Sequence, residues 1–268
     1  MITSSSNPKV KQIVQWRDSA KERHNAKVFL VEGFKMYEEA PEGDIREVYL
    51  TPEALEKAQN DSAFRKKLER TGYETVSPEA FRKMSDTQVP QGVLCVVSQP
   101  EHSLEELLTA PAPLLAVLDD LQDPGNLGTI LRTGEGAGVT GILMSDNTVD
   151  IYNPKTIRAT MGSIYRVPFA YAGDLTEAIR RMRERRIQVY AAHLAGKESY
   201  DSFSFREGTA FLIGNEGKGL SRNISALADC FLKIPMEGKV ESLNAAVSAA
   251  LLLYEARRQR RQPSGLSI

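Results

Sequence analysis

Strand-like apolar runs alternate with helix-like amphipathic stretches, and this alternation limits the possible folds more than any other feature of the sequence. In the second half the apolar runs occupy residues 114–118, 141–145, 165–171, 187–193, 209–214 and 230–235. Between or after them lie helix-like stretches at 125–137, 154–161, 174–186, 220–227 and 242–260. Strands separated by helices form mostly parallel sheets with helices on both faces. The second half is therefore predicted to be an α/β domain.

The first 98 residues show a similar rhythm on a smaller scale. An opening helix is predicted over residues 8–27, and strand-like runs follow at 28–32, 46–50, 73–77 and 93–98. A break then contains Pro100, Pro111 and Pro113. Because 268 residues favour roughly two domains, we predict a small α/β domain at 1–98, a linker at 99–113 and a larger domain at 114–262. The tail 262–268 is predicted to fray.

Composition excludes several classes of protein. With 34 Lys and Arg against 35 Asp and Glu, the net charge is −1, so the chain is not uniformly basic. Cys95 and Cys230 each lie in an apolar run and are predicted to be buried thiols in a reducing compartment. The His and Cys spacings match no zinc site, so no metal is expected. No apolar run reaches the roughly 18 residues that span a bilayer. A cytoplasmic protein is therefore expected.

Three segments are unusual for purely structural sequence, and the first is 119–138. A buried strand leads into Asp-Pro-Gly and then a helix, for which Asn126 is a good N-cap. Arg132 follows on the first turns, with Glu135 three residues later. The plain alternative is a capped helix with a surface Arg–Glu pair.

The second segment, 211–221, is an apolar strand that runs into a loop with glycines at 214, 217 and 219. Such a loop leaves backbone N–H groups available to a ligand, although a flexible turn is the simpler interpretation. Turns alone do not require a carboxylate such as Glu216. In the third segment, 234–260, Ser242 is predicted to cap a last helix whose first turns are rich in alanine, and Asn244 follows it.

Two familiar nucleotide motifs do not apply. The glycines at 136, 138 and 141 have dinucleotide-binding spacing, but they follow a helix and precede a strand, which is the reverse of the required context. This argues against an oxidoreductase. The loop at 214–221 does not match the Walker pattern either.

Taken together in this order, the three segments resemble the signature stretches of the SpoU/TrmH family of SPOUT methyltransferases. The stretches are Pro-Gly-Asn-Leu-Gly at 124–128 with Arg132 and Glu135, Ile-Gly-Asn-Glu-Gly at 213–217 with Gly219, and Ile-Pro-Met at 234–236 with Ser-Leu-Asn at 242–244. The resemblance covers about residues 113–260, and residues 1–98 resemble the substrate-binding domain that many members carry.

The resemblance implies a fold, a cofactor and a reaction. The C-terminal domain would contain a deep trefoil knot and form a homodimer. The reaction would be methyl transfer from S-adenosylmethionine to a ribose 2′-hydroxyl of structured RNA, with ribosomal RNA favoured over tRNA. By likeness, the cofactor would bind in the knot, against Gly214, Ile234, Met236, Leu243, Ala192, His193 and Leu194. An adenine ring needs an apolar slot with a few backbone partners, and these residues supply one.

The same resemblance suggests catalytic roles. Arg132 would hold the target phosphate and stabilise the developing alkoxide, or act as a base if strongly perturbed. Asn126 would position Arg132 or the ribose, and Glu216 would orient the loop or Arg132. Ser242 and Asn244 would complete the pocket.

Two basic stretches are candidates for RNA binding. One contains the lysines and arginines of 9–27 together with Trp16, and the other contains the arginines of 180–186. Both are also compatible with ordinary solvated helix faces. A second functional interpretation is a non-catalytic RNA-binding or ribosome-assembly protein. The presence of Arg132, Asn126 and Glu216 favours the enzyme. The sequence does not identify the RNA or the nucleotide.

Overall fold

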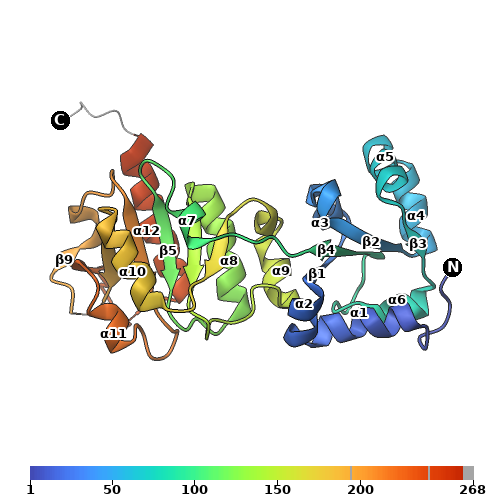
Figure 1. The fold of residues 1–268 in the computed structure, drawn as a ribbon, viewed down its shortest axis with the longest axis horizontal. Coiled ribbons are helices and arrows are strands. Elements are labelled where there is room, and N and C mark those ends of the chain that lie inside the picture. The colour runs from blue at the N-terminus through green and yellow to red at the C-terminus, as the bar shows by residue number, and fades with distance from the viewer. Residues whose placement is uncertain (194, 241, 262–268) are drawn as a thin grey trace. The chain divides into compact units, whose positions relative to one another are not determined.

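The computed structural model describes residues 1–193, 195–240 and 242–261. Its contacts divide the chain into two compact units (Figure 1). The N-terminal unit contains Met1–Pro100 and Asp150–Tyr165, and the C-terminal unit contains Glu101–Val149 and the chain from Arg166 onward. Residues 150–165 thus cluster with the N-terminal unit although they fall inside the sequence range 114–262. The predicted tail lies outside the described residues.

The N-terminal unit is built on a mixed sheet with the strand order β1-β4-β2-β3. Both β1 and β2 run antiparallel to β4, and β3 is parallel to β2. The strands are β1 Val28–Glu32, β2 Ile45–Leu50, β3 Glu74–Thr75 and β4 Val93–Ser98. All four overlap the strand-like runs of the sequence.

Helices cover both faces of this sheet because alternate strand residues on each face are apolar. Buried side chains of α1 and α6 cover the face that contains Leu30 and Val96. The helices of this unit are α1 Pro8–Asp18, α2 Ala20–Ala26, α3 Phe34–Glu39, α4 Pro52–Gln59, α5 Ser62–Thr71, α6 Pro78–Met84 and α9 Pro154–Thr160, with 3₁₀ turns η1 Glu42–Asp44 and η2 Ser163–Tyr165. The single helix predicted over 8–27 is wrong. Ser19 is extended, and its hydroxyl caps α2 by accepting the Glu22 N–H.

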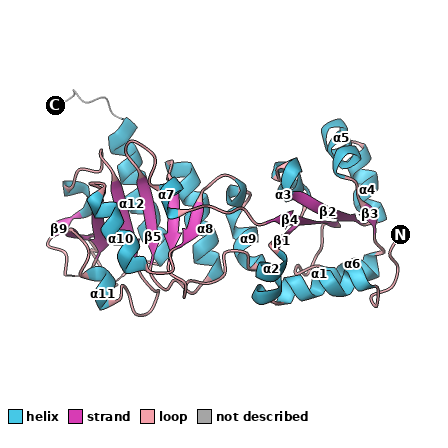
Figure 2. Ribbon diagram, viewed as in Figure 1, coloured by secondary structure: helices cyan, strands magenta, loops and turns pink. Residues whose placement is uncertain are grey.

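A parallel sheet forms the centre of the C-terminal unit (Figure 2). In the described part of the chain it has seven strands in the order β7-β6-β5-β10-β8-β11-β9, and every neighbouring pair is parallel. The strands are β5 Leu114–Leu118, β6 Gly141–Met144, β7 Phe169–Tyr171, β8 Gln188–Ala192, β9 Glu198–Ser199, β10 Thr209–Ile213 and β11 Cys230–Lys233.

Both faces of this sheet are also covered, so its central strands are apolar on both sides. Helices α7 Leu104–Leu107, α10 Leu175–Glu184 and α11 Arg222–Ser225 pack against a cluster that includes Leu115 and Val189. Helices α8 Pro124–Ala137 and α12 Ala245–Arg261 pack against each other, and α12 contacts β5 and β10. A 3₁₀ turn, η3 Tyr200–Ser202, completes the elements.

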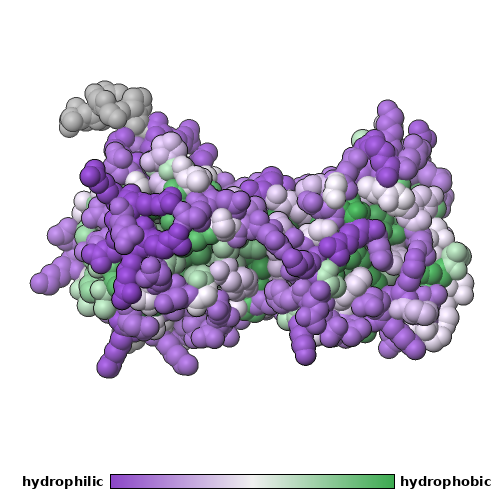
Figure 3. All heavy atoms as spheres, in the orientation of Figure 1, coloured by the Kyte–Doolittle hydropathy of each residue, from purple (hydrophilic) through white to green (hydrophobic). Residues whose placement is uncertain are grey.

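The predicted α/β architecture is confirmed. In the view of Figure 3, most of the surface is hydrophilic, and hydrophobic residues are confined to scattered patches. No helix within the described residues is both long and apolar enough to cross a bilayer. Cys95 is buried as predicted, but Cys230 is only half-buried, because β9, which flanks β11, is just two residues long.

Candidate active site

Two loops meet at the carboxyl edge of the parallel sheet, where α/β proteins commonly bind ligands. One follows β5 and the other, residues 214–221, follows β10. Asn215 Nδ2 donates to the Asp120 carbonyl at 2.8 Å. At the other end of the 214–221 loop, Ser221 donates to Asp119 Oδ2 from its backbone N at 2.8 Å and from its hydroxyl at 2.7 Å. Asp119 is only 7% exposed, so both ends of the loop are fixed to the turn after β5.

Glu216 fixes the middle of the same loop. Its Oε1 accepts hydrogen bonds from the Asp123 N–H and from Asn126 Nδ2, both at 2.9 Å, and its Oε2 accepts the Gln122 N–H at 3.1 Å. Burial raises the pKa of this carboxyl, but the hydrogen bonds from Asn126 and the two backbone N–H groups outweigh that effect and hold the pKa below its usual value. Glu216 is therefore ionised at neutral pH, and its lowered pKa and occupied oxygens make it a weak general base.

A chain of side-chain amides joins all three sequence segments. Asn126 donates to Glu216 through Nδ2, and its Oδ1 accepts from Asn244 Nδ2 at 2.9 Å. Asn244 Oδ1 in turn accepts the backbone N–H groups of Ala246 at 2.9 Å and Val247 at 3.3 Å. The start of α12 is thereby tied to the start of α8 and to the loop after β10.

Two predicted helix caps are wrong. The N-cap of α8 is Asp123, whose Oδ1 accepts the Asn126 N–H at 2.8 Å. This leaves the Asn126 side chain available for Glu216 and Asn244. The residue that caps α12 is Asn244, whereas Ser242 lies outside the helix and lines a cavity.

Gly214 occupies the tightest point of the loop. A β-carbon there would lie 2.3 Å from the backbone carbon of Gly219 and 2.3 Å from the backbone nitrogen of Leu220. The turn is closed by hydrogen bonds in both directions between Asn215 and Gly219, at 3.1 and 2.9 Å. Only glycine therefore fits at this position without displacing the backbone.

A cavity of about 1290 Å³, counted to its open mouth, lies among the loops after β8, β10 and β11. Six of the predicted cofactor residues line it, namely Ala192, His193, Gly214, Ile234, Met236 and Leu243. Ile213, Leu243 and their apolar neighbours provide a surface against which a flat ring can lie. Of the predicted catalytic residues, Glu216 and Ser242 line the cavity. Leu194 lies outside the described residues.

Arg132 is exposed on α8 and does not line this cavity. Glu135, its expected partner, is bound instead by Arg166. Within the described residues, the Arg132 guanidinium contacts no carboxylate. The surface Arg132–Glu135 pair considered from the sequence is therefore absent from this structure, and the Arg132 side chain is available to a ligand.

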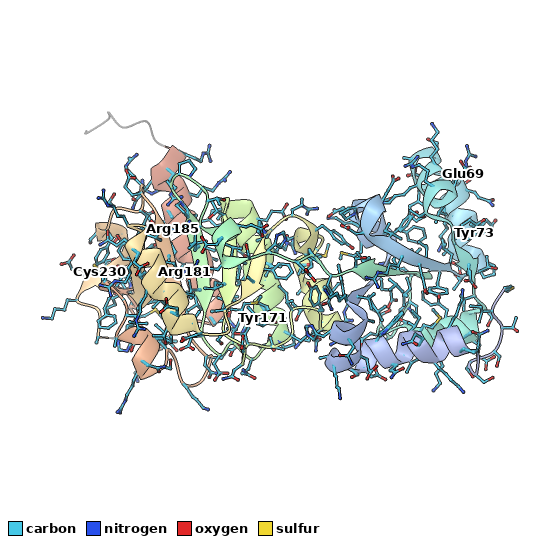
Figure 4. The ribbon with its side chains drawn as sticks, in the orientation of Figure 1. Glu69, Tyr73, Tyr171, Arg181, Arg185 and Cys230 are labelled. Carbon is cyan, nitrogen blue, oxygen red and sulfur yellow. The ribbon has the colours of Figure 1, made fainter. Side chains whose placement is uncertain are left out.

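Most charges of the two predicted basic stretches are engaged within the protein. On α10, Arg181 and Arg185, labelled in Figure 4, both pair with Glu105, and Arg183 pairs with Asp229 at 2.9 Å. In the opening stretch, Lys9 pairs with Glu74. The two arginines of that stretch are also bonded. Arg17 donates to the Lys83 and Ser85 carbonyls, and the buried Arg23 pairs with Asp150 at 2.5 Å.

Sequence reasoning missed several residues that build the site. Asp119, Gln122 and Ser221 were not singled out, although they hold the two loops together. Asp123 was treated only as a turn residue, whereas an Asp directly before Pro is a typical helix start, because Pro is favoured at the first helical position. Among the described residues, no group of three or more His, Cys, Asp or Glu side chains is placed to hold a metal ion.

Two family models match the chain. The SpoU rRNA Methylase family matches residues 113–254, which contain the signature stretches of all three segments. The MRM3-like substrate binding domain matches residues 7–95, within the N-terminal unit.

Whole-chain relatives match both units. The 23S rRNA (guanosine(2553)-2′-O)-methyltransferase RlmP of Bacillus subtilis is 33% identical, over 96% of this chain and 98% of the relative. The crystal structure of an AdoMet-bound rRNA methyltransferase from Sinorhizobium meliloti has a TM-score of 0.84 and 31% identity, over 96% of this chain and 97% of that one. The SpoU methyltransferase AviRb from Streptomyces viridochromogenes has a TM-score of 0.82 and 29% identity, over 95% and 98% of the two chains.

Proposed function

Because this chain belongs to the SpoU rRNA methylase family, we propose that it transfers a methyl group from S-adenosylmethionine to a ribose 2′-hydroxyl of ribosomal RNA. The observation that carries the proposal is the convergence of three separate segments on one cavity through Glu216, Asn126 and Asn244. A relative that matches nearly the whole chain is named as a 23S rRNA 2′-O-methyltransferase. A tRNA substrate is the alternative within the same chemistry.

The residues around the cavity fit the cofactor. Ile234, Met236 and Leu243 would enclose the adenine, and the backbone beside Gly214 would approach closely because position 214 carries no side chain. Ala192 and His193 would contribute the loop after β8. When bound, S-adenosylmethionine supplies a methyl group that its sulfonium already activates. The protein then has to align the 2′-oxygen and stabilise charge as the hydroxyl loses its proton.

Arg132 would stabilise the developing alkoxide and hold the neighbouring phosphate. An ordinary guanidinium stays protonated, so it is a poor base but a strong donor. Asn126 and Asn244 would act by positioning, because their amides are already committed to Glu216 and to the cap of α12. Ser242, at the edge of the cavity, would contact the substrate.

The alternative of a non-catalytic RNA-binding protein is less well supported. A protein that had lost catalysis would not need both an ordered amide network and an arginine that pairs with no carboxylate of the described residues. Arg132, Asn126 and Glu216 are all present, and the hydrogen-bond network between the last two is complete. These observations favour the enzyme.

The N-terminal unit would bind the RNA, with its predicted range at 1–98 and a linker at 99–113. The match of residues 7–95 to a substrate-binding domain supports this role. Lys11 and Lys21 are exposed and have no carboxylate partner among the described residues, so part of the predicted basic stretch is available to phosphates.

A homodimer and a trefoil knot are further parts of the proposal. Helix α12 exposes Val247 at 48% and Tyr254 at 49% of their surfaces, and these line an open groove with Ala250 and Leu251. Exposed apolar patches of this kind typically mark association surfaces. Helix α12 contacts β10 and β5 and packs on α8, so the last helix returns to the elements next to the first two segments.

Action in the cytoplasm follows from the proposed substrate. The matched relatives come from bacteria, and bacterial ribosomal RNA is transcribed and assembled in the cytoplasm.

Mapping 2′-O-methylation across total RNA, from cells with and without the gene, tests the function directly. The expected result is the loss of one methylated ribose in 23S rRNA, restored by the wild-type gene. Calorimetry should show binding of S-adenosylmethionine to the isolated protein. An unchanged methylation map together with no cofactor binding would favour the non-catalytic alternative, and a lost methyl group in tRNA would replace the rRNA assignment.

A further inference from the structure

Two lysines line the candidate cofactor cavity. Lys218 and Lys233 both line the cavity, both are exposed, and neither contacts a carboxylate within the described residues. By contrast, the arginines of α10 at 180, 181, 183 and 185 are all ion-paired. Arg260 of α12 is enclosed by carbonyl oxygens of Ala112, Pro113, Phe205 and Glu207.

The cavity lining carries less negative than positive charge. Glu216 is the one carboxylate among the described lining residues, and its oxygens already accept from Asn126 and from the backbone of Gln122 and Asp123. The two lysines outnumber this carboxylate, so the described lining has a net positive charge in the free protein. Charges in such a position attract an anion.

The backbone places the two lysines at the same edge of the sheet. Lys218 lies in the closed turn between Asn215 and Gly219, and its N–H donates to Asn215 Oδ1 at 3.0 Å. Lys233 is the last residue of β11, in register with Ser199 of β9. Because β10 and β11 are parallel to β8, which lies between them, their carboxyl ends lie on one edge with the cavity between the loops.

The cofactor itself does not supply the missing anion. S-adenosylmethionine has one carboxylate, one ammonium and one sulfonium, so its own cationic groups more than balance its carboxylate and it brings no net negative charge. A ribose in RNA, in contrast, is flanked by two phosphates. We propose that Lys218 and Lys233 bind the RNA phosphates next to the target ribose and so place its 2′-hydroxyl at the cavity. This inference rests on the proposed function and identifies substrate-binding residues that no motif singled out.

Salt-dependent RNA binding tests the proposal. The variants are Lys218→Ala, Lys233→Ala and their double variant, with Arg180→Ala as the control. Arg180 is an exposed cation of the same unit, and it is paired with Glu177 at 3.6 Å. The probe is a set of transcripts that together cover 23S rRNA. Each phosphate contact contributes about 0.7 to 0.9 to the slope of log K against log salt concentration, so each lysine variant should flatten the slope by that amount.

The double variant should flatten the slope by the sum of the two single effects, and Arg180→Ala should leave the slope unchanged. All variants should bind S-adenosylmethionine as the wild type does. An unchanged slope in the double variant would overturn the proposal. Weaker cofactor binding with an unchanged slope would also overturn it, by assigning the lysines to the cofactor carboxylate. Absence of methyl transfer by the wild type would count against the proposed function alone, because the slopes report binding and still decide the role of the lysines.

Discussion

At the scale of single residues, the site depends on which groups are already bonded and which are available. Glu216, Asn126 and Asn244 use their polar atoms on each other and on backbone N–H groups. Arg132 uses none on a carboxylate of the described chain. This division separates residues that hold the geometry from the residue that has an unused charge for the substrate.

Replacing Arg132 tests that division. If the guanidinium acts on the developing alkoxide, Arg132→Ala should lower kcat by about 10²–10³ and leave cofactor affinity unchanged. Arg132→Lys should restore little, because a point charge does not reproduce the planar fork. Single-turnover methylation of the mapped RNA provides the measurement. Near-wild-type rates in both variants would remove Arg132 from the mechanism.

The charge on Glu216 predicts a pH dependence of stability. A carboxyl with a lowered pKa in the folded state stabilises the protein above its unfolded pKa, and this contribution is lost as the pH falls through the folded value. Glu216→Gln places an amide among donors, so it should destabilise the protein by about 1 kcal/mol at neutral pH, a value reduced by solvent exposure.

Urea unfolding of wild type and Glu216→Gln across a pH series checks this prediction. The difference in free energy of unfolding should be present at neutral pH and should shrink toward acid. A difference that stays constant with pH would mean that the charge of Glu216 contributes nothing, and that the substitution acts through shape alone.

At the scale of elements, the loop 214–221 is the part that needs external support. It has no regular structure beyond its closed turn, and it is held at one end by Asp119 and in the middle by Glu216. Asp119 and the backbone partners of Glu216, which are Gln122 and Asp123, belong to the turn between β5 and α8. The loop that would bind the cofactor and the helix that carries Arg132 are therefore parts of one hydrogen-bonded assembly.

Asp119→Ala should therefore weaken cofactor binding without removing any residue from the cavity. The variant loses two hydrogen bonds to Ser221, and we expect the Kd for S-adenosylmethionine to rise about tenfold, which corresponds to about 1.4 kcal/mol. Ser221→Ala is the matched control, because it loses the hydroxyl bond and keeps the backbone bond. Calorimetry should show a smaller effect for this control. Equal cofactor affinities for wild type and Asp119→Ala would show that the Asp119–Ser221 hydrogen bonds do not support cofactor binding.

At the scale of the whole molecule, the apolar face of α12 has no covering element among the described residues. Val247 and Tyr254 are exposed along a helix whose opposite side is fully buried through Leu252 and Leu253. Burying such a face in a second copy would stabilise the protein through apolar area removed from water.

Sedimentation velocity of Val247→Glu and Tyr254→Glu tests the proposed dimer. Each charge would have to enter the interface without a partner, so the double variant should sediment as a monomer while the wild type sediments as a dimer. Arg261→Glu, at the exposed end of the same helix, is the control and should not change the state. A wild-type protein that sediments as a monomer would contradict the proposed dimer.

The sequence by itself determined where most helices and strands lie and which segments form the site. Apolar periodicity is a local property, so it predicted nearly all the strands of both units, and the three polar segments marked the carboxyl edge of the sheet. Most of the cofactor residues then proved to line one cavity. The break of the opening helix at Ser19 was missed because a hydroxyl can cap a helix or lie within one, and only the surrounding chain decides which.

Only the tertiary structure decided which polar group bonds to which. Asn126 was expected to cap α8, yet Asp123 does so and leaves Asn126 to join Glu216 and Asn244, which are 90 and 118 residues away. Glu135 was the partner of Arg132 only in the plain alternative, and it binds Arg166, while residues 150–165 cluster with the N-terminal unit. Hydrogen bonds and ion pairs depend on distances across the fold, and spacing along the chain does not specify those distances.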